Sequence, residues 1–75
     1  MPSFLVEVYV ARAQDARAAA RQLRREAGPV RYVRMTFLPG DETCFHLLEA
    51  ASAEAVAEVC RRAGLGSPRI VPAVE

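Results

Sequence analysis

The chain has 75 residues, 52% of them hydrophobic, and this composition excludes a disordered or low-complexity protein. Ten arginines against nine acidic residues leave a net charge of +1, which is too small for a nucleic-acid partner. No apolar run reaches the roughly 18 residues of a membrane span, and Glu7 interrupts the N-terminal apolar run, unlike a signal peptide. We therefore expect one domain over residues 1–75, located in the cytoplasm, with reduced cysteines and no membrane partner.

The first half of the chain predicts a strand, a helix and a second strand. In residues 4–10 strongly apolar positions alternate with mixed positions. This two-residue period is typical of a strand with one apolar face. Residues 14–27 are rich in alanine and arginine at helical spacing, and Gly28 follows where a C-terminal cap belongs. Residues 30–38 alternate again. The turn sequence of residues 39–41 then joins this strand to another over residues 42–49, so the pair forms a hairpin.

The second half adds a helix and a last strand. Ser52 is a suitable N-cap for a helix that Gly64 closes. Residues 69–71 begin a strand that Pro72 confines to a sheet edge or a bulge. Short loops and right-handed crossovers make the simplest solution an α+β ferredoxin-like βαββαβ fold, with a four-stranded antiparallel sheet and two helices on one face.

Because the helices cover only one face of such a sheet, the other face must contact water, a ligand or a partner. Strand alternation predicts that the helix-covered face carries Phe4, Val6, Val8, Val33, Met35, Phe37, Phe45 and Leu47. It predicts that the open face carries Leu5, Glu7, Tyr9, Tyr32, Arg34, Thr36, Cys44, His46 and Leu48. Half of the open-face set is apolar, so we expect a homodimer packed face to face, as in a dimeric α+β barrel.

The same alternation places four candidate functional residues together, namely Glu7, Arg34, Cys44 and His46. Cys44 and His46 are two residues apart on one strand, about 6.7 Å, and with Glu7 they could bind one metal ion. Two other interpretations stay open. Cys44 is a buried thiol beside a Glu7–His46 pair in a dimer interface, or His46 acts as a general base. Contact with Glu7 would raise the pKa of His46 above its usual value near 6.5.

Four short runs and one single residue resemble the small bacterial nickel-responsive ferredoxin-like family. They are MPSFLVE at residues 1–7, ETCFHLLEA at 42–50, Ser52 with EAV at 54–56, and RAGL at 62–65. The resemblance implies a ferredoxin-like fold, pairing through the open sheet face, and nickel or another divalent transition metal bound there in some members. It matches Glu7 to the family's glutamate in the first strand. It also matches Arg34 to a position where metal-binding members often carry histidine, and His46 to one where relatives often carry cysteine.

Three functions therefore stay open, and the sequence does not decide whether the protein is an enzyme. The first is a dimeric protein that binds a metal or a small ligand through Glu7, Cys44 and His46. In that function Tyr9, Tyr32 and Arg34 line the site on the open sheet face. The second is a cofactor-free monooxygenase or isomerase of the dimeric α+β barrel type, with His46 as the base. The third is a module whose open face binds only a second copy of itself.

Overall fold

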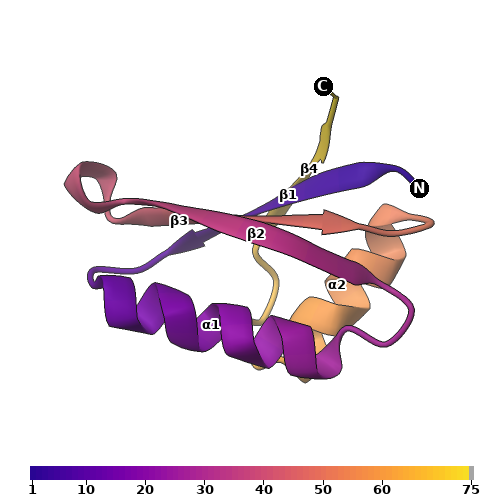
Figure 1. Cartoon of the computed structure of the whole chain (residues 1–75), viewed down its shortest axis with the longest axis horizontal. Coiled ribbons are helices and arrows are strands. Elements are labelled where there is room, and N and C mark those ends of the chain that lie inside the picture. Colours follow the sequence, from indigo (N-terminus) through magenta and orange to yellow (C-terminus); the bar gives the residue numbers. More distant parts are fainter. Residues whose placement is uncertain (75) are drawn as a thin grey trace.

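The computed structural model describes residues 1–74, and their elements follow the predicted order (Figure 1). These elements are β1 (Ser3–Tyr9), α1 (Ala13–Glu26), β2 (Arg31–Leu38), a 3₁₀ turn (Pro39–Asp41), β3 (Thr43–Glu49), α2 (Ala53–Arg62) and β4 (Arg69–Ala73). The sheet has the strand order β2-β3-β1-β4 with every neighbouring pair antiparallel. Both helices lie against the same face of the sheet (Figure 1). The predicted ferredoxin-like α+β fold is therefore confirmed.

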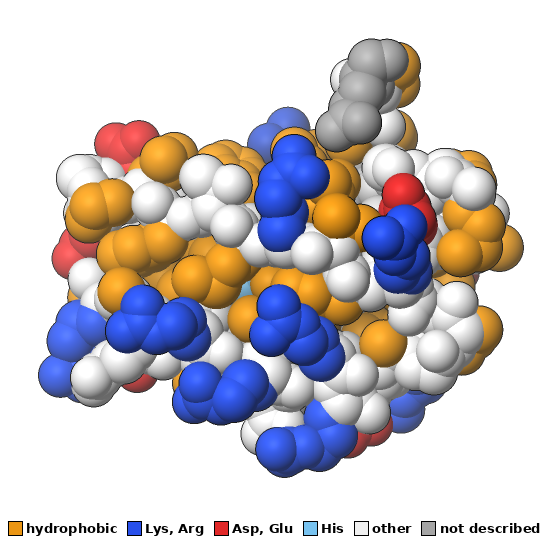
Figure 2. All heavy atoms as spheres, in the orientation of Figure 1, with side chains coloured by type: hydrophobic (Ala, Val, Ile, Leu, Met, Phe, Trp, Pro, Cys, Tyr) orange, Lys and Arg blue, Asp and Glu red, His pale blue; other side chains and the backbone are white. Residues whose placement is uncertain are grey.

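Each helix is amphipathic, and its buried stripe faces the sheet. In α1 the buried residues are Ala16, Ala19, Ala20 and Leu23. The three small alanines allow the helix to lie close to the sheet, and Leu23 fills the core. The arginines of α1 stay exposed and gather along one side of the molecule (Figure 2). The described residues include no helix long and apolar enough to cross a membrane.

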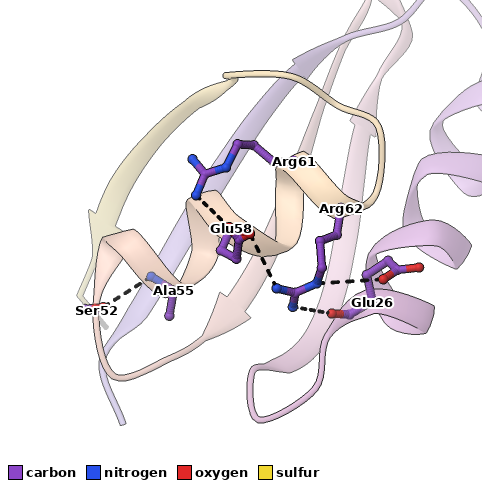
Figure 3. Close-up of polar contacts among 6 residues, drawn as sticks. All are labelled: Glu26, Ser52, Ala55, Glu58, Arg61 and Arg62. Carbon is purple, nitrogen blue, oxygen red and sulfur yellow. Dashed lines mark hydrogen bonds and ion pairs between the residues drawn. The ribbon is translucent and has the colours of Figure 1, made fainter.

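Local capping fixes both ends of α2. The hydroxyl of Ser52 accepts a hydrogen bond of 3.2 Å from the backbone N–H of Ala55 (Figure 3). At the other end Gly64 has a positive φ of 82°, and the N–H of Leu65 donates to the carbonyl of Cys60 at 2.9 Å. This is the geometry of a Schellman cap, in which a glycine adopts the left-handed conformation that ends the helix. The predicted start and end of the second helix are therefore confirmed.

Arg62 of α2 joins the two helices. Its guanidinium donates a hydrogen bond of 2.9 Å to the backbone carbonyl of Glu26 at the C-terminal end of α1, and it also pairs with the side chains of Glu26 and Glu58 (Figure 3). The carbonyls in the last turn of a helix have no partner inside the helix, so this contact satisfies one of them. The adjacent Arg61 pairs with Glu58 on its own helix.

The register of β1 and β3 corrects the predicted faces of β3. Val6 lies opposite His46, and Val8 lies opposite Cys44. Directly opposed residues in an antiparallel pair point to the same face, so Cys44 and His46 point toward the helices with the core residue Val6. Phe45 and Leu47 point to the open face instead. The predictions for β1 were correct, whereas those for β3 were inverted.

A β-bulge corrects the predicted face of Tyr32. Tyr32 pairs with Leu48 and Arg34 pairs with the adjacent Leu47, so Val33 is an extra residue on β2. An extra residue shifts the side-chain alternation by one position. Tyr32 therefore points toward the helices and packs against the core, while Arg34 stays on the open face as predicted.

Candidate functional site

Two rows of side chains cross the open face of the sheet, one residue from each strand. The first row consists of Arg34, Leu47, Leu5 and Val71. The second row consists of Thr36, Phe45, Glu7 and Arg69. Half of these eight side chains are apolar, and neither helix covers them (Figure 1).

A pocket of about 210 Å³ is lined by three residues of the first row and two of the second. Leu5 and Leu47 contribute apolar surface from the two central strands, and Phe45 adds an aromatic ring. Arg34 and Thr36 border the pocket on the β2 side, and Ala73 and Val74 border it near the end of the chain. The pocket thus combines an apolar centre with a polar edge on β2, which is the usual composition of a small-molecule site.

Two ion pairs join charged strand residues on the open face. Glu7 forms an ion pair of 3.8 Å with Arg69, and Glu49 forms one of 3.1 Å with Arg31. With Arg34, the four strands carry three arginines and two glutamates, all on this face. The strand residues therefore give the open face a net positive charge.

Tyr9 and Glu7 border a second pocket, of about 410 Å³, near the end of β1. Val8 of β1 lines it too, and the remaining lining residues belong to β4 and to the loop that follows α2, among them Leu65 and Arg69. Tyr9 is 76% exposed. The two tyrosines predicted to line one site are therefore separated, because Tyr32 lies on the opposite face of the sheet.

His46 lies in the hydrophobic core beneath the sheet and is fully buried. Its Nδ1 shares a hydrogen bond of 2.8 Å with the hydroxyl of Tyr32, and the ring of Tyr32 contacts the guanidinium of Arg24 at 4.8 Å. The buried Nε2 has no hydrogen-bond partner among the described residues.

Burial sets the protonation of the inner cluster formed by Tyr32, Cys44 and His46. It lowers the pKa of His46 to about 4, because a charged imidazolium would lose its hydration there. Burial raises the pKa of Tyr32 to about 12 despite the opposing charge of Arg24, and burial also raises the pKa of the Cys44 thiol. The predicted upward shift for His46 was wrong, because Glu7 lies on the other face. At neutral pH this cluster is an uncharged imidazole, phenol and thiol.

The predicted metal ligands are therefore not brought together. Glu7 points to the open face, whereas Cys44 and His46 point into the core. Within residues 1–74 no group of three or more histidine, cysteine or acidic side chains could hold a metal ion. A protonated thiol is also a poor ligand, since metals bind the thiolate. The donors of one chain do not fit a metal ion, and His46 does not face the open-face pocket as a ligand or as a base.

Phe45 and Leu47 are the pocket residues that sequence reasoning missed. Both were placed on the helix-covered face, because β3 is apolar at most of its positions and alternation alone does not fix its phase. Thr43 and Glu49 are separated from them by even numbers of residues, so the polar ends of the strand carried a weak signal for the correct face.

The sheet with both helices on one face and a pocket on the other defines a ferredoxin-like protein with an uncovered sheet face. Comparison with family models gives a match over residues 5–72 to the family described as "Nickel responsive protein SCO4226-like". The chain belongs to this SCO4226-like family, and the resemblance found in the sequence is confirmed.

Comparison with solved structures supports the fold. The crystal structure of SCO4226 from Streptomyces coelicolor A3(2) is similar with a TM-score of 0.82 and 24% sequence identity. The match covers 97% of this chain and 99% of that chain. No curated protein matches this chain.

Proposed function

We propose that the chain is a small-ligand-binding protein that forms a homodimer through its open sheet face, with the ligand held in the open-face pocket. The observation that carries this proposal is the 210 Å³ pocket, which has an apolar centre on a face that no helix covers. A second copy placed against this face would cover the row formed by Leu5, Leu47 and Val71. It would also close the pocket from solvent.

The size of the chain supports pairing. A 75-residue domain buries a small fraction of its surface compared with larger domains, so its own core provides a small margin of stability. Covering apolar area contributes roughly 25 cal/mol per Å², and on the open face the half-buried Leu5, Phe45 and Val71 still have apolar surface that a second copy would cover. Symmetric pairing uses the same patch on both copies, so the single open face is sufficient.

The oligomeric state tests the pairing. Light scattering at about 100 µM is expected to give twice the 8.2 kDa mass of one chain, with a melting temperature that rises with protein concentration. Two substitutions, Phe45→Glu and Thr36→Glu, each introduce a charge on the open face and should yield folded monomers. Thr36 is exposed, so its substitution does not disturb the core. Gln22→Glu adds the same charge on exposed α1 and should stay dimeric. A wild-type mass near 8.2 kDa would refute the pairing.

The family match favours nickel binding as a second candidate function. Glu7 is the predicted ligand that lies on the open face, and its ion pair with Arg69 opposes the approach of a cation. Calorimetric titration of the metal-free protein with NiCl₂ separates the two candidates. Saturable binding that Glu7→Gln abolishes would support nickel at the open face, and the absence of binding would leave the small-ligand function.

A further inference from the structure

We infer that the outer edge of β2 and the arginines of α1 beside it form a docking surface for an extended, acidic segment of a partner protein, which adds to the sheet as a further strand. The inference does not rest on the function proposed for the open-face pocket, because this surface lies on the helix side of the sheet. It follows from the edge position of β2, from two apolar side chains along that edge and from the charge of α1.

Strand β2 lies at an edge of the sheet, because it pairs with β3 and with no other strand of residues 1–74. The outward-pointing backbone groups of an edge strand can pair with an extended peptide. The bulge ends at Val33, so residues 35–38 have a regular register with β3. The other edge strand, β4, contains Pro72, which has no N–H to donate. Strand β2 has no proline and is the better edge for strand addition.

Met35 and Phe37 make the helix side of this edge apolar. Met35 lies opposite His46 and Phe37 opposite Cys44, so both point toward the helices. Both are only half-buried, whereas His46 and Cys44 on the neighbouring strand are fully buried. Figure 2 shows hydrophobic side chains between β2 and α1, with basic side chains along α1. A strand added to β2 would cover the apolar surface that Met35 and Phe37 still expose.

The exposed Arg17, Arg21 and Arg24 lie on one side of α1, because their spacing is i, i+4 and i+7. This side lies next to β2, since the guanidinium of Arg24 is 4.8 Å from the ring centre of Tyr32. No acidic side chain of residues 1–74 forms an ion pair with these three arginines. Like charges at i, i+4 repel and destabilise a helix, so an acidic partner would relieve the repulsion between Arg17 and Arg21.

The spacing of these arginines fits an extended chain. Arg17 and Arg21 are about 6 Å apart along the axis of α1. Alternate residues of an extended strand are about 6.7 Å apart and point to the same face. Glutamates at alternate positions would therefore place consecutive carboxylates near consecutive arginines. Neither a nucleic acid nor a lipid surface has the regular N–H and C=O groups that pair with a strand edge, so the observations favour a protein segment.

Amide NMR titration with a blocked hexapeptide of alternating glutamate and valine tests the inference. Binding is expected to shift the amides of residues 17–24 and 35–38 and to weaken as salt is added. The same peptide with glutamine in place of glutamate is the control for charge and should bind at least about fivefold more weakly.

Two N-methylated forms of the acidic peptide test the backbone pairing. One is methylated at the glutamates and the other at the valines. In an extended strand only one of these two sets has its N–H groups turned toward β2. One form should therefore bind at least about fivefold more weakly than the other, although their charges are equal.

Two protein variants test the arginines. Arg21→Gln removes one charge from exposed α1 and should weaken binding of the acidic peptide about threefold. Arg61→Gln removes the same charge from exposed α2 and should leave the affinity unchanged.

Four results would overturn the inference. They are no binding of the acidic peptide, equal binding of the two N-methylated forms, an equal effect of Arg21→Gln and Arg61→Gln, and shifts confined to open-face residues. Oligo-deoxythymidine and phosphatidylglycerol vesicles test the other polyanions. Tighter binding of either one than of the peptide, weakened by Arg21→Gln, would assign the arginines to a nucleic acid or a lipid surface and would also overturn the inference.

Discussion

The buried position of His46 predicts a defined loss of stability in mild acid. Burial lowers the pKa of His46 to about 4 in the folded protein, whereas the unfolded chain has the ordinary value of 6.5. As the pH falls below 6.5, the unfolded state takes up a proton that the folded state excludes, so unfolding becomes more favourable. The contribution of the uncharged His46 to stability is fully present above pH 6.5 and is lost as the pH falls to about 4. Below that pH the folded protein is protonated too.

The size of this loss of stability follows from the pKa values of His46 in the folded and unfolded states. A difference of about 2.5 units, at 1.36 kcal/mol for each unit, gives a loss of about 3 kcal/mol between pH 6.5 and 4. The structural cause is burial: among residues 1–74 the buried Nε2 has no hydrogen-bond partner, and the nearby Tyr32 lies against the cationic Arg24. Burial therefore removes the hydration that would stabilise an added proton on His46.

Urea unfolding of the wild-type protein and of His46→Gln, followed by circular dichroism at several pH values, measures this loss. Gln retains an acceptor for the hydroxyl of Tyr32 but does not titrate, and the acidic residues titrate in both proteins. The difference between the two pH profiles therefore isolates His46, provided that the protein concentration is constant.

The reasoning would be refuted by parallel pH profiles, or by an NMR titration in which His46 has a pKa of 6.5 or higher. The chain contains a single histidine, so the imidazole signal is unambiguous.

Three further predictions follow from the contacts. Arg62→Met should lower the free energy of unfolding by about 1 kcal/mol, because it removes the hydrogen bond to the end of α1. In the same urea experiment the control Arg61→Met should change the free energy of unfolding by less than about 0.5 kcal/mol. Ser52→Ala should cost about 1 kcal/mol through loss of the N-cap, and an unchanged unfolding midpoint would contradict it. Cys44 and Cys60 should both resist alkylation in the native protein, because both are buried and burial raises both pKa values; rapid labelling of Cys44 would place it on the open face after all.

The order of elements could be predicted because its signals are local. The cap at Ser52, the left-handed Gly64 and the turn at residues 39–41 each depend on the chemistry of a few adjacent residues. Strand β1 also has a clear alternation, with Phe4 and Val6 buried and the residues between them less so. Its faces were therefore predicted correctly.

The faces of β3, and the face of Tyr32 at the start of β2, could not be read in the same way, whereas the alternation from Arg34 to Phe37 was predicted correctly. Strand β3 carries Cys44, Phe45, Leu47 and Leu48, so both of its faces are apolar and either phase satisfies the pattern. The register with β1 decides between them, and this register is a long-range property. The bulge at Val33 has no local signal either, because it appears only when β2 pairs with β3.

The phase of β3 also changes the chemistry that the candidate residues can perform. With His46 and Cys44 on the open face, the sequence describes a site for a cation. With both turned into the core, burial keeps the imidazole and the thiol uncharged, and neither can serve a ligand on the open side of the sheet. The exposed Arg34 then becomes the charged group at the edge of the pocket. A shift of one residue in one strand thus decides whether the candidate donors lie together on the open face or apart on its two sides, and the residue types alone do not determine it.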